Sequence, residues 1–134
     1  MPVTSKTQVN ALKKLSNDRL QNCCIKSNEG KKSYKSEGLT GRNLISSDAK
    51  LSWDHGFQVF HFQLEPDDCS DWNAYSGSEV IFVQSGELTV KLIDETWRLF
   101  SGDTATIPKG VVRQFLNSSD NKLEFIRVRG DIKV

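Results

Sequence analysis

The sequence predicts an all-β fold, either a sandwich or a barrel, and three observations favour this class. From Lys50 onward, runs of β-branched and aromatic residues alternate with turn residues at the spacing of about 8–12 positions that is typical of such folds. Within the runs, apolar residues recur at every second position, so each strand has one side for a core. No helical period competes in this half, and 134 residues suffice for one domain with a buried core.

Strands are expected throughout the second half of the chain. Gly86 and Gly102 are turn residues between them. The expected strands are residues 57–64, 79–83, 87–93, 97–100, 104–107, 112–116 and 123–128. The residues expected to face the core in the first and third of these strands are Phe60, Phe62, Leu64, Leu88, Val90 and Leu92.

The first third of the chain differs in charge and in pattern. Residues 1–45 carry a net charge of +6, and the remainder carries −5. We therefore expect residues 1–47 to form a basic, partly disordered N-terminal arm, in which the start of the chain can form a short amphipathic helix, and residues 48–134 to form the barrel domain. Such an arm can contact nucleic acid or an acidic partner, although scattered lysines are also typical of a solvated segment.

Cysteine usage and hydropathy bear on the compartment. The three cysteines, Cys23, Cys24 and Cys69, are odd in number and form no CxxC motif, which favours a reducing, intracellular location. No apolar run approaches the ~20 residues of a membrane span, and the N-terminus has no hydrophobic signal core, so no membrane partner is expected.

Two spaced patterns frame the predicted barrel. The first consists of Asp67, Asn73, Tyr75, Glu79 and Gly86, and the second of Gly102, Pro108, Gly110, Arg113 and Asn117. These spacings resemble the two sequence motifs of the cupin family, which implies a jelly-roll barrel, also described as a double-stranded β-helix. The resemblance covers residues 57–129 and implies a fold rather than a function, because the family includes oxygenases, isomerases, sugar epimerases, ligand sensors and storage proteins.

The metal centre that this resemblance would imply has lost most of its ligands. Asn73, Tyr75 and Arg113 stand where the family has histidine, and only Glu79 keeps a ligand type. The guanidinium of Arg113 stays protonated and offers no lone pair to a metal. We therefore expect no metal, no other cofactor and no assigned catalytic residue. If Arg113 and Glu79 face each other inside the barrel, an ion pair takes the place of the metal.

One branch of the family matches further details. Residues 86–88, 92–96, 99–103 and 107–110 are similar to the C-terminal cupin domain of centromere protein C, which also lacks the metal ligands. That resemblance implies a non-catalytic homodimerisation and partner-binding module at the kinetochore, hence in the nucleus. Its partners would be other centromere proteins, or chromatin reached through the basic arm. The N-terminal side does not match the nucleosome-binding motif of that family.

A homodimer is also expected from the first strand of the barrel. If Phe60 and Phe62 point inward, then Phe57, Val59 and His61 point outward. Two apolar side chains on an outer face are better explained by a partner than by solvent. His61 is expected at the surface or in this dimer interface rather than as a ligand or general base.

The alternative function is a cytoplasmic, metal-free cupin that binds a small molecule, as a ligand sensor or as an isomerase or epimerase. It would use a barrel pocket lined by Asn73, Tyr75, Glu79 and Arg113. Tyr75 and Glu79 could supply an acid and a base, but the His–Asp dyad of metal-free sugar epimerases is not found. A barrel filled with side chains favours the dimerisation module, and an open cavity beside these four residues favours the alternative.

Overall fold

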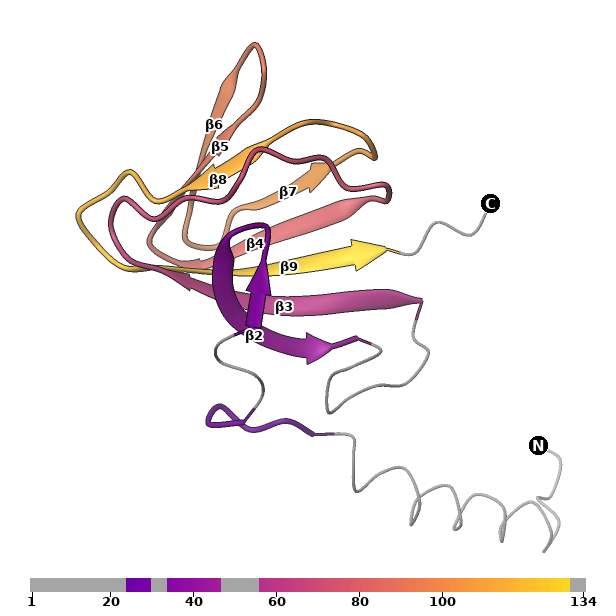
Figure 1. Ribbon diagram of the computed structural model, residues 1–134. Coiled ribbons are helices and arrows are strands. Elements are labelled where there is room, and N and C mark those ends of the chain that lie inside the picture. The colour runs from indigo at the N-terminus through magenta and orange to yellow at the C-terminus, as the bar shows by residue number, and fades with distance from the viewer. Residues whose placement is uncertain (1–23, 30–33, 47–55, 131–134) are drawn as a thin grey trace, which may run out of the picture.

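The computed structural model describes residues 24–29, 34–46 and 56–130, and the strands of this part form two antiparallel sheets (Figure 1). The larger sheet has the order β1-β2-β3-β9-β4-β7, and the smaller has the order β6-β5-β8. The strands are β1 (Tyr34–Ser36), β2 (Leu39–Ile45), β3 (Phe57–Leu64), β4 (Glu79–Ser85), β5 (Glu87–Lys91), β6 (Thr96–Phe100), β7 (Thr104–Ile107), β8 (Gln114–Leu116) and β9 (Leu123–Gly130). Among the described residues, no helix is long and apolar enough to cross a membrane.

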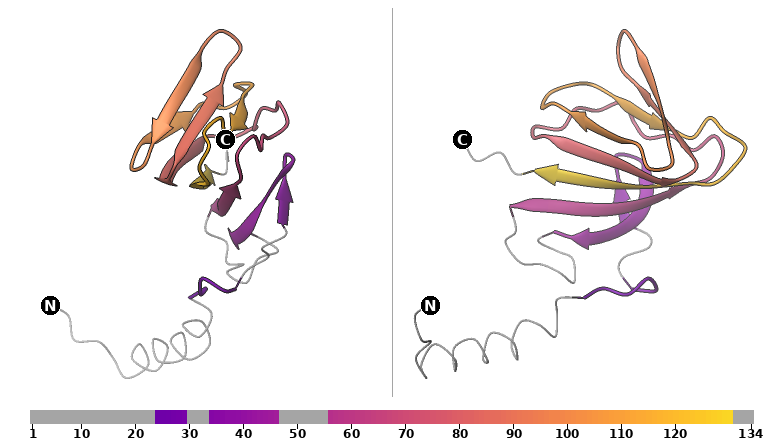
Figure 2. Two further views of the ribbon diagram at one scale, coloured as in Figure 1. Left: turned by 90° about the vertical axis from the view of Figure 1, so that its left-hand side faces the viewer. Right: turned by 180° about the vertical axis from the view of Figure 1, so that it is seen from behind.

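The core lies between the two sheets, which face each other (Figure 2). Alternation along each strand turns every second side chain inward, so β3, β4 and β9 each contribute apolar residues from one face. The rings of Phe62, Phe115 and Phe125 meet at centroid distances of 5.4 and 5.6 Å, which joins β3, β8 and β9. The buried apolar residues are Leu39, Phe60, Phe62, Leu64, Ile81, Val83, Leu88, Val90, Ile107, Phe115, Leu123 and Phe125.

The all-β prediction is confirmed, and the seven expected strands are present as β3 to β9. For β3 and β7 the expected bounds, 57–64 and 104–107, agree with the structure at both ends. The core faces expected for the first and third predicted strands are also confirmed, with Leu92 partly buried against the core. The strand expected from residue 112 begins only at Gln114, because Arg113 pairs with Asn73 in an isolated bridge just before it.

Residues 34–46 correct the expectation of a basic arm, because they form β1 and β2 and extend the larger sheet. Glu37 and Gly38 connect the two strands with φ angles of 56° and 84°, which is the backbone of a two-residue hairpin. A Cβ on Gly41 would overlap the carbonyl oxygen of His61, so this glycine permits the close pairing of β2 with β3. The expected helix before residue 22 and the boundary at 47/48 lie outside the described residues.

The motif positions that resemble cupin glycines are left-handed turns. Asp67, which stands at a glycine position of the first motif, has a φ of 70°, and Gly86 has a φ of 90°. A Cβ on Gly86 would lie 2.6 Å from the carbonyl oxygen of Lys122, so this position needs glycine for space as well as for conformation. Asn117 is fully buried and donates hydrogen bonds to the carbonyl oxygens of Leu64 and Asn121 at 3.1 and 2.8 Å. Its role is therefore structural.

Candidate functional site

The two charged residues of the cupin-like motifs meet inside the barrel. Glu79 is the first residue of β4 in the larger sheet, and Arg113 precedes β8 in the smaller sheet. Arg113 donates to both carboxylate oxygens of Glu79, from Nε to Oε1 at 2.7 Å and from Nη2 to Oε2 at 2.9 Å. The side chains are 0% and 1% exposed. A bidentate ion pair therefore bridges the two sheets at the positions where the motif resemblance implies metal ligands.

Two further arginines on β9 complete the positive side of this cluster. Alternation along β9 turns Leu123 and Phe125 toward the core, and the same face continues with Arg127 and Arg129. Arg129 donates from Nε to Glu79 Oε2 at 3.0 Å. The guanidinium of Arg127 is fully buried and lies 4.8 Å from the ring centroids of both Phe60 and Phe62. The inward face of β9 thus changes from apolar to cationic along its length.

A second carboxylate reaches the cluster from the hairpin at the edge of the larger sheet. Glu37, at the tip of the β1–β2 hairpin, accepts hydrogen bonds from Arg129 Nη2 at 2.6 Å and from Arg113 Nη2 at 3.0 Å, and its Oε2 lies 3.5 Å from Arg127 Nη1. Its side chain is 9% exposed. The hairpin that was not expected from the sequence therefore supplies a charged group to the site.

The remaining predicted pocket residues are peripheral to this cluster. Asn73 is exposed, and its backbone pairs with that of Arg113 through hydrogen bonds of 3.0 and 2.9 Å. Its carbonyl oxygen also accepts from Arg113 Nη1 at 2.7 Å, and its amide Nδ2 donates to Glu37 at 3.3 Å. The ring of Tyr75 lies 4.3 Å from the guanidinium of Arg129. The structure thus brings Asn73, Glu79 and Arg113 together, and Tyr75 joins them through Arg129.

The cluster carries an excess of positive charge. Its three arginines face two carboxylates in the described part of the chain, which leaves one net charge. Burial alone would raise the pKa of Glu79, but its hydrogen bonds and charge attraction to Arg113 and Arg129 outweigh burial and lower the pKa below 4.5. Burial, together with the nearby charge of Arg129, lowers the pKa of Arg127 to about 10. Arg127 Nε and Nη1 donate no hydrogen bond to any described residue.

This arrangement is suited to holding charge rather than to binding a metal or transferring a proton. Within the described residues, no group of three or more histidine, cysteine, aspartate or glutamate side chains could hold a metal ion. Arginine cannot replace such a ligand, because it has no lone pair to donate. With its lowered pKa and its oxygens already hydrogen-bonded, Glu79 is a poor general base at neutral pH.

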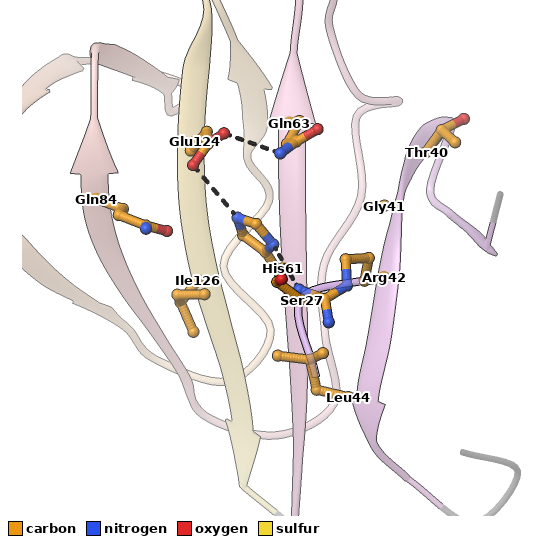
Figure 3. A pocket seen from close by; sticks show the side chains of 10 residues that line it. All are labelled: Ser27, Thr40, Gly41, Arg42, Leu44, His61, Gln63, Gln84, Glu124 and Ile126. Atoms are coloured by element: carbon orange, nitrogen blue, oxygen red, sulfur yellow. Dashed lines mark hydrogen bonds and ion pairs between the residues drawn. The ribbon is translucent and has the colours of Figure 1, made fainter. Parts of the chain in front are cut away.

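Three cavities in the described part of the chain lie away from this cluster. One of about 570 Å³ opens on the outer face of the larger sheet, beside His61, Arg42 and Glu124 (Figure 3). Another of about 470 Å³ lies beside the β5–β6 hairpin, and a third of about 130 Å³ lies between β2 and the end of β3. None of these three is lined by any of the four predicted pocket residues.

The residues predicted for a dimer interface lie on the outer face of β3. Phe57 is 41% exposed and Val59 is partly buried. His61, expected at the surface or in the dimer interface, is only 8% exposed in the single chain and lies between Arg42 and Glu124 (Figure 3). Its Nε2 is 3.7 Å from Glu124 Oε2, and burial lowers its pKa below 6.5 despite this carboxylate. Burial therefore favours the neutral form of this imidazole.

Sequence reasoning missed Glu37, Arg127 and Arg129. The signal for the two arginines was present, since the alternation that assigns Leu123 and Phe125 to the core places both on the same face. Glu37 carried a weaker signal: the pair Glu37-Gly38 indicates a turn, but nothing in the local sequence indicates what the turn contacts.

Comparison with known proteins agrees with this architecture. A family model described as a cupin domain matches residues 60–129. The structure is similar to a cupin 2 conserved barrel domain protein from Salinispora arenicola, with a TM-score of 0.66, 14% identity, and coverage of 81% of this chain and 90% of that one. It is also similar to an RmlC-like cupin from Shewanella frigidimarina, with a TM-score of 0.66, 15% identity, and coverage of 83% and 92%. A cupin domain from Bordetella pertussis is similar as well, with a TM-score of 0.58, 20% identity, and coverage of 74% of this chain and 99% of that one. No curated protein matches significantly in sequence.

Proposed function

Because the chain belongs to the cupin family, we propose that its barrel is a non-catalytic homodimerisation and partner-binding module. One observation carries this proposal: the position that would hold a metal is occupied by the buried ion pair of Glu79 and Arg113. Function is then expected on the outer surface of the barrel. The small-molecule alternative would need open space beside these two side chains, and both are almost completely buried.

The outer face of the larger sheet supports pairing with a second copy. The register places Val59, Val128 and Val80 side by side across β3, β9 and β4, with Ile126 and Phe82 in the adjacent row. Val80 and Phe82 are 36% and 43% exposed. We call these five residues the outer apolar face. An antiparallel sheet in a barrel normally carries polar side chains on its solvent side, so this face is suited to being covered.

A second copy of the chain is the simplest cover for this face. A two-fold axis would place the same five residues opposite themselves, and an uncharged aliphatic and aromatic patch is self-complementary. Burial of each of these side chains would stabilise the pair by at most about 1.5–3 kcal/mol. The cavity of about 570 Å³ beside His61 and Glu124 would then lie at the polar margin of this interface (Figure 3).

Light scattering during size-exclusion chromatography tests this proposal. We expect a molar mass of about 30 kDa, twice the chain mass of 15.1 kDa. A single species of one chain mass at tens of micromolar would contradict the dimer and promote the small-molecule alternative.

A more specific form of the proposal is a centromeric role. Three observations support it: the resemblance of four short segments between residues 86 and 110 to the C-terminal cupin of centromere protein C, the lost metal ligands, and the net charge of +6 over residues 1–45. In this form the protein acts in the nucleus, pairs with itself, and recruits centromere proteins or contacts chromatin through its basic residues. A fluorescent fusion that concentrates at centromeres in dividing cells would support this role, and a diffuse cytoplasmic signal would contradict it.

A further inference from the structure

The carboxylate of Glu37 is held in the way that a protein holds a carboxylate ligand. Three guanidinium groups converge on it from β9 and from the segment before β8, with the shortest contact of 2.6 Å to Arg129 Nη2. Asn73 Nδ2 adds a neutral donor at 3.3 Å. Planar guanidinium groups match a carboxylate in geometry, and burial strengthens each contact.

The backbone of Glu37 has a conformation that glutamate seldom adopts, which indicates that contacts elsewhere in the fold hold this residue in place. Glu37 has a φ of 56° at the first central position of its hairpin turn, where asparagine, aspartate and glycine are favoured. A glutamate gains nothing from this conformation locally. The conformation nevertheless directs its side chain into the cluster of arginines.

We propose that Arg113, Arg127 and Arg129 form a carboxylate-binding site, which Glu37 fills as an internal ligand and which a small free carboxylate fills when Glu37 is withdrawn. The three arginines exceed the two carboxylates by one charge, and the buried Nε and Nη1 of Arg127 have donor capacity left. Without Glu37, the excess rises to two positive charges around a space the size of one carboxylate group. Such a space favours a small anion with two coplanar oxygens.

The tip of the hairpin lies at the edge of the larger sheet, and Leu39, just after the turn, is buried in the core. Among the described strands, β1 pairs with β2 alone and forms the edge of the larger sheet. The contact of β2 with β3 begins at Gly41, beyond the turn. Two hydrogen bonds restrain the turn: Asp71 N donates to the carbonyl oxygen of Glu37 at 2.7 Å, and Arg127 Nη2 donates to Ser36 Oγ at 2.8 Å. Removal of the Glu37 side chain leaves both of them in place.

The Glu37→Gly variant with formate as the probe tests the site. Glycine accepts the left-handed turn, so this substitution removes the carboxylate without straining the backbone. With formate replacing chloride at constant ionic strength, we expect a saturable rise in the melting temperature of Glu37→Gly of roughly 4 °C or more, and little change for the wild type. Isotope-labelled formate followed by saturation-transfer NMR should show contact with the variant only.

Three control variants and one control anion make the result specific. Glu37→Gln keeps a side chain in the space and should not respond to formate. Glu87→Ala removes a carboxylate that pairs with the exposed Arg98, and should not respond either. Adding Arg129→Met to Glu37→Gly removes the shortest donor and should weaken formate binding roughly tenfold or more. Phosphate should stabilise Glu37→Gly less than formate does, because the space is planar and small.

An absence of saturable formate binding to folded Glu37→Gly would overturn the proposal. If this variant is unfolded in chloride, recovery of the folded state by formate supports the site, and failure to fold at saturating formate overturns it. An equal effect of phosphate and formate would contradict the carboxylate class. The site lies inside the barrel, so its test does not depend on whether the outer apolar face forms a dimer.

Discussion

Arg113 joins the two sheets of the barrel by donating to both oxygens of Glu79, at 2.7 and 2.9 Å, with neither side chain accessible to solvent. The pair lies at the positions where the motif resemblance implies metal ligands. A metal centre can be emptied and refilled, whereas an ion pair formed by two covalently attached side chains is a permanent part of the fold. Stability measurements therefore address the site directly.

Arg113→Met should destabilise the protein by about 3–5 kcal/mol, because it leaves Glu79 buried with a weaker set of partners. Arg127→Met should be neutral or stabilising, because Arg127 is the excess charge of the cluster and its guanidinium already lies over two phenylalanine rings. Urea unfolding of both variants checks this contrast. A loss from Arg127→Met as large as that from Arg113→Met would contradict the charge balance described for the cluster.

The lowered pKa of Glu79 predicts a loss of stability in acid. A carboxyl group with a lower pKa in the folded state than in the unfolded state stabilises the fold above its ordinary pKa of 4.5, and this contribution disappears as the pH falls through the lower, folded value. Unfolding free energies measured from pH 7 downward should therefore fall below about pH 4.5. In Glu79→Gln the fall should be shallower, and equal slopes for both proteins would contradict a lowered pKa.

We expect the purified protein to contain no stoichiometric transition metal. Three of the four positions that resemble cupin ligands are Asn73, Tyr75 and Arg113, and none offers an imidazole. Elemental analysis checks this after purification without chelators. About one iron, manganese, nickel or zinc per chain that disappears in Glu79→Ala would contradict the expectation.

Gly102→Val and Gly110→Val should each cost on the order of 1 kcal/mol or more, because these glycines have φ angles of 88° and 76°. Apart from the flanking residues, no atom of the described chain lies within 4 Å of a Cβ built on either, so the cost should arise from the backbone alone. Thermal unfolding checks both variants against Thr106→Val, an exposed strand position. Midpoints equal to the wild type would show that the left-handed turns are not required.

The larger part of the fold could be predicted because its signals are local. Phe60, Phe62 and Leu64 alternate with polar or outward residues, and alternation of this kind depends on strand geometry rather than on neighbours. The hairpin of β1 and β2 could not be recognised in the same way. β1 has only three residues, and the inward positions of β2 after Leu39 are taken by Gly41 and Asn43 rather than by large apolar side chains. The place of the hairpin in the sheet depends on the contact of Gly41 with β3.

For a related reason, the sequence predicted only some residues of the candidate site. Spacing alone placed Glu79 and Arg113 at ligand positions, because both belong to one pair of motifs. The contact of Glu37 with Arg129 joins residues 92 positions apart, and no local pattern encodes such a pairing. Arg127 is charged at a position where the alternation along β9 predicts an apolar side chain. Such an exception to the apolar pattern is typical of a specialised site.

The central claim is that this barrel acts through its outer apolar face, and sedimentation equilibrium of a matched pair of variants tests it most directly. Val59→Glu places a charge within the row of Val59, Val128 and Val80, whereas Ile93→Glu places the same charge on a residue that is 79% exposed near the β5–β6 hairpin. We predict a dimer for the wild type and Ile93→Glu and a folded monomer for Val59→Glu, with circular dichroism confirming that the barrel remains intact. A wild-type monomer, or a Val59→Glu dimer as tight as the wild type, would contradict the account.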